Sequence, residues 1–376
     1  MKVRELSFEN YRNLCSGAFT PDAGVNVIWG SNAQGKTNLL ESIWLFTGGH
    51  SFRGSRDADL VRREPDGKPR ESARLELKFS GGGREQVAEI KLQNGRRAGT
   101  LNGVGKRTAS ALVGAFCAVV FSPEHLSLVK DGPSERRSFL DSAICQLRPS
   151  YAGMLNHYNR TLQQRNSLLK DIPRHGELLD TLEIWDERLA GFGAGIMAER
   201  QRYVKRLAPE AGHIYLGISR QKEELGIQYQ MTAAAEETAE EQYRQAMVEA
   251  LRRCRRDDLG AGFTTVGPHR DDLLLTINGA AARVFGSQGQ QRSAVLALKL
   301  AEAAVLEEII GEPPVVLLDD VMSELDTQRQ EYLLNHLEGR QIFITCCDPA
   351  NVRLLEHGGV FQVQEGEILQ EAEGKE

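Results

Sequence analysis

The sequence has no run of apolar residues close to the roughly 20 that a membrane-spanning helix needs. Its opening, Met-Lys-Val-Arg-Glu-Leu-Ser-Phe, also lacks the apolar centre of a secretory signal peptide. Hydrophobic residues make up 41% of the 376 positions and charged residues 26%, which is ordinary for a globular protein with a normal core. We therefore expect a cytoplasmic protein that is not attached to a membrane.

Cysteine is scarce and shows no spacing typical of a metal site or a redox pair. None of the six cysteines forms a C-x-x-C pair with another, so we expect reduced thiols, in agreement with a cytoplasmic location. The six are Cys15, Cys117, Cys145, Cys254, Cys346 and Cys347.

An excess of basic charge is also missing, since the net charge is −6. A local basic cluster can still bind nucleic acid, and two such clusters are present. From the residues alone, an edge hairpin kept soluble by basic side chains or a solvated helix end explains each cluster as well as a phosphate contact does. The candidate DNA contacts are Lys91, Arg96, Arg97, Lys106 and Arg107 in the first cluster, and Arg252, Arg253, Arg255 and Arg256 in the second.

The most informative stretch is a glycine-rich segment that matches G-x-x-x-x-G-K-[ST]. Residues 25–29 before it predict a buried strand, and residues 38–46 after it predict a helix. In this setting the loop's N–H groups bind phosphate oxygens, Lys36 reaches the β- and γ-phosphates, and Thr37 offers a hydroxyl to Mg²⁺. We expect a nucleoside triphosphate to bind here, although a glycine-rich turn with a chance Lys-Thr pair is the alternative. The loop residues are Gly30, Ser31, Asn32, Ala33, Gln34, Gly35, Lys36 and Thr37.

Three later stretches fit the same site. Residues 315–318 predict a buried strand that ends in Asp319 and Asp320. Asp319 would hold Mg²⁺ through water and Asp320 would orient or deprotonate the attacking water, although both could instead cap a helix. A Ser-Glu-Leu-Asp segment ending at Asp326 follows. Earlier, Ser287-Gln-Gly-Gln-Gln precedes a predicted helix at 292–310, where the Ser287 hydroxyl and the Gly289 amide can face an anion. Taken alone, this stretch is explained at least as well by an ordinary loop, because clusters of Ser, Gly and Gln are common in loops.

The rest of the chain predicts further elements in order. A strand at 2–8 is followed by an antiparallel hairpin at 73–79 and 87–92, which turns at Asn94-Gly95 and Asn102-Gly103 extend. A buried strand is expected at 117–121, helices at 134–207, broken near Pro173 and Gly176, and a strand at 225–231. A helix at 236–256, two strands around a polar turn at 264–279 and a strand at 341–344 complete the prediction.

The motifs together resemble those of ABC-type ATPase heads of the SMC kind, and among these the whole chain is similar to the RecF family. The resemblance implies an α/β fold, an ABC-type P-loop ATPase head of two lobes. A nucleotide lobe with a mixed sheet would comprise residues 1–130 and 313–376, and a helical lobe with a small sheet would comprise 131–312. The matching stretches, in family order, are residues 8–13, 30–37, 121–124, 132–141, 267–272, 287–291 and 317–326.

The resemblance further implies a head-to-tail homodimer that forms on ATP. Ser287 and Gly289 of one copy would contact the γ-phosphate held by the other, with Gln290 as a further nucleotide-binding residue and Asp326 at the seam. Lys36, Asp319, Asp320 and Thr345 would form the catalytic set. Thr345 follows a predicted strand where many ABC proteins carry a switch histidine, and Asp320 replaces the usual glutamate, so we expect slow hydrolysis.

Relatives in this family bind single-stranded DNA and single-strand/double-strand junctions or gaps. They act with RecR and RecO to load recombinase, and they support SOS induction. The resemblance therefore implies a weak, DNA-stimulated ATPase of replication and recombinational repair, with Arg12, Arg53 and Arg56 as further candidate DNA contacts. The alternatives are the ATPase subunit of a transporter and an ATP-gated structural scaffold with little turnover.

Overall fold

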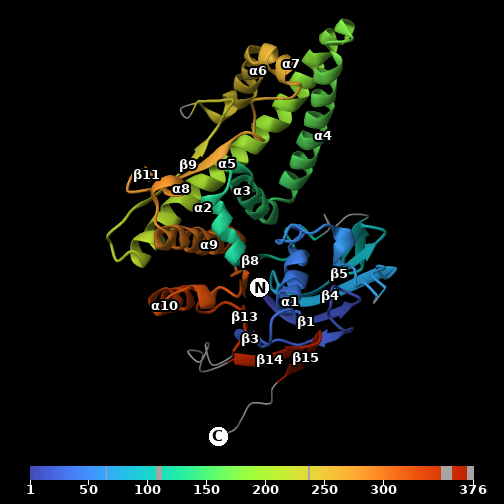
Figure 1. The fold of residues 1–376 in the computed structure, drawn as a ribbon, viewed down its shortest axis with the longest axis vertical. Coiled ribbons are helices and arrows are strands. Elements are labelled where there is room, and N and C mark those ends of the chain that lie inside the picture. Colours follow the sequence, from blue (N-terminus) through green and yellow to red (C-terminus); the bar gives the residue numbers. More distant parts are fainter. Residues whose placement is uncertain (65, 107–111, 236–237, 349–357, 371–376) are drawn as a thin grey trace. The chain divides into compact units, whose positions relative to one another are not determined.

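The computed structural model describes residues 1–64, 66–106, 112–235, 238–348 and 358–370 (Figure 1). The chain forms two compact units, one of residues 1–126 and 295–376 and one of residues 127–294. The predicted lobes, 1–130 with 313–376 and 131–312, stay a prediction, because compactness alone does not show that parts fold or move independently.

The first unit contains a six-stranded sheet in the order β15-β14-β3-β13-β12-β8, parallel except for the edge strand β15. Every residue of β8, β12 and β13 is buried, as expected for apolar strands covered on both faces. The register places Asp319 opposite Thr345 and Thr345 opposite Ile28. The strands are β3 Val25–Trp29, β8 Ala118–Phe121, β12 Val315–Asp319, β13 Ile342–Cys346, β14 Gly358–Gln364 and β15 Glu367–Gln370.

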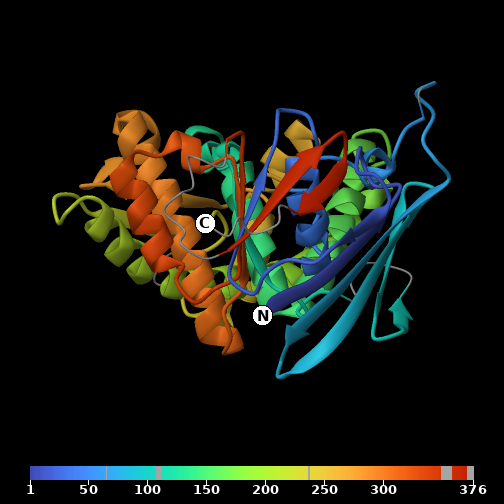
Figure 2. The same cartoon turned by 90° about the horizontal axis from the view of Figure 1, so that it is seen from below.

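A second sheet in this unit is antiparallel, in the order β2-β1-β4-β5-β6-β7, and Figure 2 shows its blue and cyan strands twisted past one another. The predicted tight turns at Asn94-Gly95 and Asn102-Gly103 are confirmed, since both central residues of each have positive φ, and Gly82-Gly83 between β4 and β5 forms a third such turn. The strands are β1 Lys2–Glu9, β2 Gly17–Phe19, β4 Ser72–Gly81, β5 Arg84–Gln93, β6 Arg96–Leu101 and β7 Val104–Lys106.

Helix α1, Lys36–Trp44, begins directly after the phosphate loop. Its side chains Leu39, Leu40 and Ile43 are fully buried in one apolar cluster with residues from both sheets. Burying three such side chains contributes on the order of 5 kcal/mol, which fixes the start of the helix against the sheet. A short 3₁₀ turn, η1 Leu45–Thr47, follows and ends at Gly48 with φ of 82°, a left-handed conformation that glycine adopts without strain.

The second unit is mainly helical. Helix α5 runs eleven residues beyond the predicted end at 207, through Pro209. The buried side chains Ala211, Ile214, Tyr215 and Ile218 explain this, because their packing offsets the roughly 3 kcal/mol that an internal proline costs. The helices are α2 Ser127–Lys130, α3 Pro133–Leu147, α4 Pro149–Asp171, α5 Leu182–Ile218, α6 Tyr243–Arg253, α7 Arg255–Ala261 and α8 Ala282–Phe285.

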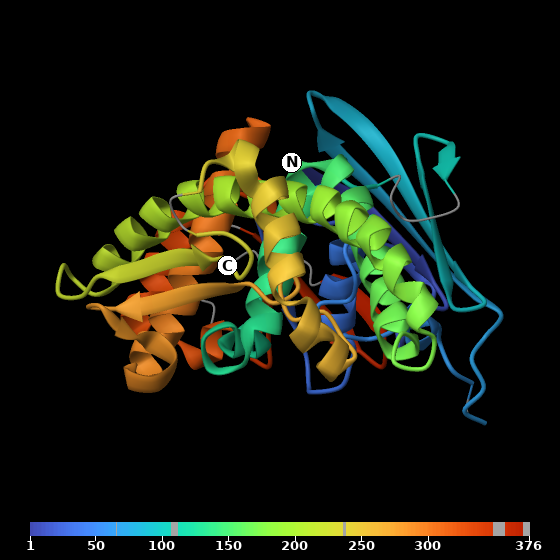
Figure 3. The ribbon, with the colours of Figure 1, turned by 90° about the horizontal axis from the view of Figure 1, so that it is seen from above.

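A three-stranded sheet in the order β11-β10-β9 completes this unit, and Figure 3 shows β9 and β10 side by side. The strands are β9 Leu225–Gln230, β10 Asp272–Ile277 and β11 Ala280–Ala281. The predicted helix at 236–256 was wrong at its start, since α6 begins at Tyr243 and a break at Cys254 separates it from α7; residues 236–237 lie outside the described residues. Helix α9, Gln288–Ile310, begins here and continues into the first unit, which also holds α10, Thr327–His336.

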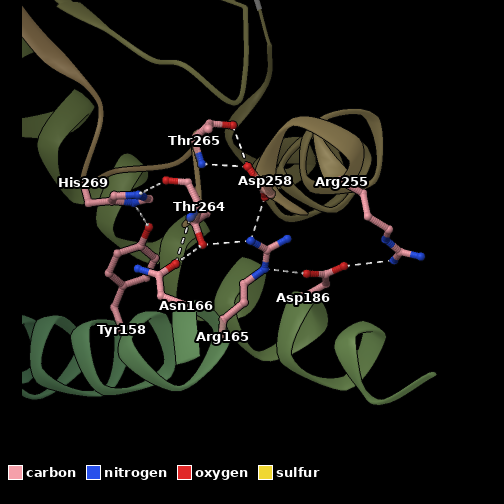
Figure 4. A network of polar contacts seen from close by, with 9 residues as sticks. All are labelled: Tyr158, Arg165, Asn166, Asp186, Arg255, Asp258, Thr264, Thr265 and His269. Carbon is pink, nitrogen blue, oxygen red and sulfur yellow. Dashed lines mark hydrogen bonds and ion pairs between the residues drawn. The ribbon is translucent and has the colours of Figure 1, made fainter. Parts of the chain in front are cut away.

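The strand predicted around residue 264 does not form. Side chains satisfy its backbone instead: the Thr264 N–H donates to Asn166 Oδ1 at 2.8 Å and the Thr265 N–H to Asp258 Oδ1 at 2.9 Å. These side chains belong to a buried network around Arg165, which bonds Asp186 and Asp258 at 2.7 Å each (Figure 4). A charge buried this deeply is tolerated only with such partners, so this network holds α4, α5 and α7 together.

Candidate nucleotide-binding site

The phosphate loop has the backbone shape that its glycines predict. Gly30 has φ of 150° and Gly35 has φ of 123°, and Ala33 between them is also left-handed at 65°. A side chain at Gly30 would place Cβ 2.4 Å from the Val363 carbonyl oxygen of β14, so only glycine fits there. The loop therefore curls at the end of β3 and delivers the chain into α1, where the first N–H groups of the helix have no intrahelical partner.

Lys36 is folded back over this loop. Its Nζ donates to the carbonyl oxygens of Gly30 at 2.6 Å and Ser31 at 3.0 Å, and the residue is 8% exposed. These contacts keep the ammonium group at the centre of the loop. The arrangement suits an anion that approaches the loop, because positive charge and free N–H groups then face the same space.

Asn13, which was not among the predicted site residues, braces the loop from outside. Its Nδ2 donates to the Ala33 carbonyl oxygen at 3.0 Å, and its Oδ1 accepts from Asn38 Nδ2 at 2.6 Å. Arg53 Nη1 in turn donates to Asn38 Oδ1 at 3.0 Å. Gln34 accepts the N–H of Glu365, which ties the loop to the β14–β15 turn. The sequence could have indicated Asn13, because residues 8–13 are one of the stretches that carry the family resemblance.

Asp319 at the end of β12 lies beside the loop. Its Oδ1 accepts hydrogen bonds from the hydroxyls of Thr37 at 2.8 Å and Thr345 at 2.9 Å. Burial raises the pKa of this carboxyl group, while the two hydroxyls partly oppose the change. The charges of Asp320 and Arg53 act on this pKa in opposite directions, Asp320 raising it and Arg53 lowering it. Asp319 and Thr37 thus place one carboxylate and one hydroxyl side by side, which are oxygen ligands of the kind that a hard cation takes.

The predicted strand at 341–344 ends before Thr345, whereas in the structure Thr345 lies inside β13. It is 1% exposed, and its Oγ1 also accepts the Asp320 N–H at 2.9 Å. The hydroxyl is thus fully used in holding Asp319 and Asp320. Asp320 has φ of 55°, a strained conformation for a residue other than glycine, which this hydrogen bond helps to maintain.

Two further residues near the loop were missed. Cys347 is exposed at the end of β13, with Sγ 3.2 Å from Asn32 Oδ1 and 4.0 Å from Lys36 Nζ, so this residue and not Thr345 faces the phosphate loop. Glu124 follows β8; burial raises the pKa of its carboxyl, Arg53 opposes this, and Asp319 reinforces it. The sequence could have indicated Glu124 because it follows the predicted buried strand at 117–121, which forms β8 next to β12.

Asp326 caps a helix. Its side chain accepts the Arg329 N–H at 3.0 Å at the start of α10 and pairs with the Arg329 guanidinium, which together lower the pKa of its carboxyl. Its carboxylate is half exposed and so still accessible to a partner molecule.

Ser287 and Gln290 form a reciprocal cap at the start of α9. Gln290 N–H donates to Ser287 Oγ at 3.2 Å, and Ser287 N–H donates to Gln290 Oε1 at 2.8 Å. Ser287 is exposed and Gly289 is half-buried. The Gln290 side-chain amide also donates to Glu223 Oε1 at 2.8 Å, and the predicted contact of Gln290 with nucleotide stays a prediction.

The candidate DNA contacts of the first unit separate into two kinds. Lys91, Arg96, Arg53 and Arg56 are exposed. Arg97 is 7% exposed and donates from Nη1 to the Gly49 carbonyl oxygen at 2.6 Å, so it has an internal partner, and its predicted contact with DNA stays a prediction. Alternation within β6 turns it inward while its neighbour Arg96 faces outward.

Arg12 is likewise committed to a structural role. Its guanidinium makes two hydrogen bonds of 2.9 Å to Glu41, a fully buried residue of α1, and its predicted contact with DNA stays a prediction. Arg107 lies outside the described residues, and only the backbone of Lys106 is described.

In the second unit, Arg253 and Arg256 are exposed. Arg252 is exposed but pairs with Glu183 at 2.7 Å. Arg255 pairs with the buried Asp186 at 3.1 Å, so part of its charge is already neutralised within the fold. None of the helices in the described part of the chain combines the length and apolar character needed to traverse a bilayer.

Comparison with known proteins gives a consistent result. The family described as RecF/RecN/SMC N-terminal domain matches residues 2–368. The chain is 39% identical over 350 residues to the DNA replication and repair protein RecF of Acetivibrio thermocellus, covering 93% of this chain and 94% of that protein. It is 41% identical over 377 residues to RecF of Caldanaerobacter subterraneus subsp. tengcongensis, covering 99% and 100%.

Solved structures agree. The ATP complex of the recombination mediator RecF, of the RecFOR pathway, superposes with a TM-score of 0.91 at 40% identity, covering 99% of this chain and 98% of that one. An Smc head bound to the winged-helix domain of ScpA has a TM-score of 0.57 at 15% identity, covering 100% and 98%, which shows a shared fold. The fold is therefore the predicted SMC-like ABC ATPase head, and the chain belongs to the RecF family of DNA replication and repair proteins.

Proposed function

We propose that this protein is an ATP-controlled DNA-binding switch of replication and recombinational repair. ATP binds at the phosphate loop, where Lys36 and the N–H groups of the loop and of α1 meet the phosphates. The proposal rests mainly on the contact of Thr37 with Asp319, which joins the loop to the acidic strand. The solved ATP complex of a RecF recombination mediator supports the choice of nucleotide.

Thr37, and Asp319 through water, would hold Mg²⁺, because the hydrogen bonds to this buried carboxylate come from two neutral hydroxyls. When bound, Mg²⁺ supplies neutralising charge to the phosphates. Asp320 orients a water molecule and accepts its proton as the water oxygen attacks the γ-phosphorus; the bond to the β-phosphate oxygen breaks, giving ADP and phosphate. Thr345 keeps both aspartates in place. Because Asp320 is shorter than glutamate and no histidine occupies the end of β13, turnover is slow, below about one per second.

Pairing of two copies completes each site. Ser287 and Gly289 at the start of α9 meet the γ-phosphate held by the other copy, and Asp326 lies at the seam. Val284 and Phe285, directly before this motif, are 70% and 75% exposed. Two large apolar side chains beside a polar helix start are the composition of a surface that a partner covers.

DNA is the partner of the paired form. Single-stranded DNA and single-strand/double-strand junctions or gaps are the proposed substrates, with RecO and RecR as protein partners in loading recombinase and supporting SOS induction. The names of the relatives, which refer to DNA replication and repair and to the RecFOR pathway, support this part of the proposal. The exposed Lys91, Arg96, Arg253 and Arg256 are the candidate phosphate contacts.

Sedimentation with ATP and gapped DNA tests the switch. Wild type is expected to form dimers with ATP, whereas Lys36→Ala and Ser287→Arg each stay monomeric. A mixture of these two variants is expected to regain ATP-dependent dimers, because one composite site then combines an intact loop with an intact Ser287. Ser150→Arg, at an exposed serine of α4, is the control for added charge. Failure of wild type to pair at saturating ATP, with DNA present, would refute the proposal.

A further inference from the structure

Gln290 holds its amide in one orientation. Its Oε1 accepts from the Ser287 N–H at 2.8 Å, and its Nε2 donates to Glu223 Oε1 at 2.8 Å. A carboxylate only accepts and a backbone N–H only donates, so rotating the amide by half a turn would break both contacts. Glu223 therefore determines which way the oxygen of Gln290 points.

This orientation defines the free group on Ser287. The Oγ atom accepts the Gln290 N–H at 3.2 Å, and the Ser287 N–H is occupied by the Gln290 oxygen. The hydroxyl hydrogen remains as the donor that can serve an anion. Ser287 is exposed, so a ligand brought by another molecule can reach it.

Glu223 is itself held firmly by the end of α5. Tyr215, fully buried in the last turn of that helix, donates from its hydroxyl to Glu223 Oε2 at 2.9 Å. The chain then turns sharply, with Arg220 and Gln221 at φ of 54° and 63°, and Glu223 N–H donates to Ser219 Oγ at 3.3 Å. Two consecutive left-handed residues other than glycine are costly, which indicates that the turn is built to return Glu223 toward α9.

We propose that Glu223, held by Tyr215, is a positioning residue for the nucleotide contact between two copies. It fixes Gln290, and through Gln290 it fixes the donor direction of Ser287. This inference rests on the proposed function, in which Ser287 meets the γ-phosphate bound to the other copy. It assigns to Glu223, Tyr215 and Gln290 a role in pairing without direct contact with ATP.

The test compares Glu223→Ala with Glu224→Ala, its exposed neighbour, whose own bonds to the Asn278 turn use the backbone. Glu223→Ala is expected to weaken ATP-dependent dimerisation about tenfold, the factor that corresponds to about 1.4 kcal/mol, while Glu224→Ala matches wild type. ATP affinity of the single copy, measured in a Ser287→Arg background, is expected to be equal in both. Glu223→Gln, which retains an acceptor oxygen, is expected to recover most of the loss.

A double-mutant cycle shows whether the effect passes through Gln290. If it does, Glu223→Ala combined with Gln290→Ala is no weaker in dimerisation than Gln290→Ala alone. Additive losses would overturn the inference. Tyr215→Phe, which keeps the buried ring and removes only the hydroxyl, is the variant to use if Glu223→Ala unfolds, and it is expected to weaken dimerisation in the same way.

Different results would refute the proposed function and the positioning role of Glu223. If wild type does not form dimers with ATP, the proposed function fails. If wild type forms dimers and Glu223→Ala forms them as tightly as Glu224→Ala, only the positioning role fails. A loss of single-copy ATP affinity in Glu223→Ala would also overturn it, since the effect would then not be confined to the contact between copies.

Discussion

Replacing Thr345 by valine removes one hydroxyl and preserves the shape of the side chain. The hydroxyl donates to Asp319 Oδ1 at 2.9 Å and accepts the Asp320 N–H at 2.9 Å, and the residue is 1% exposed. Valine therefore leaves one backbone N–H unpaired and one buried carboxylate with a single donor. We expect the free energy of unfolding to fall by about 2 kcal/mol, within the range for an unpaired buried group.

The loss is expected to depend on pH. Burial already raises the pKa of Asp319, so the carboxylate opposes folding increasingly as pH rises through that pKa, and protonation at low pH removes the penalty. Without the Thr345 hydroxyl the pKa rises further. The difference in unfolding free energy between wild type and Thr345→Val should therefore be smaller below the pKa of Asp319 and larger above it.

Urea unfolding without nucleotide or Mg²⁺ measures this difference. A Trp185→Phe background leaves Trp29 and Trp44, both in the unit that contains Thr345, as the fluorescent reporters. Thr345→Ser, which keeps the hydroxyl, is the matched control and should lose much less. Equal losses in the serine and valine variants, or no dependence on pH, would refute the reasoning.

Three further predictions follow from single contacts. Arg97→Ala should lower the free energy of unfolding by about 1–3 kcal/mol and leave DNA affinity unchanged, because Arg97 bonds the Gly49 carbonyl inside the fold, whereas Arg96→Ala should do the reverse. Alkylation of Cys347 should block ATP binding, because its Sγ lies 4.0 Å from Lys36 Nζ, and ATP should protect it. Burial lowers the pKa of His269 from 6.5 to about 4, so stability should fall as pH drops through this window.

Each of these has a result that would contradict it. DNA affinity is measured by titration of labelled gapped DNA. If a fully stable Arg97→Ala variant binds this DNA more weakly than wild type, Arg97 contacts DNA after all. ATP binding to the alkylated wild type, with Cys347→Ser as the insensitive control, would remove Cys347 from the site. A His269→Gln variant with the same acid dependence as wild type would show that other groups cause it.

Local patterns in the sequence were sufficient for the elements whose causes are local. The phosphate loop, the strand before it and the helix after it follow from glycine spacing and apolar periodicity, and the three tight turns follow from Gly-Gly and Asn-Gly pairs. Sequence patterns gave the wrong secondary structure where hydrogen-bond partners come from residues far away in the chain. Residues after Thr264 do not form a strand, because Asn166 and Asp258 satisfy their backbone.

In the nucleotide site, too, some features follow from local sequence and others from residues that are distant in the chain. Residue type alone indicated Lys36, Thr37 and Asp319, because each stands at a fixed position in a motif or at the end of an apolar strand. Which neighbours they have depends on strand order: the insertion of β13 between β3 and β12 sets Thr345 beside Asp319. Only the tertiary structure decides such contacts, because hydrogen bonds and burial depend on groups that approach in space from stretches far apart in sequence.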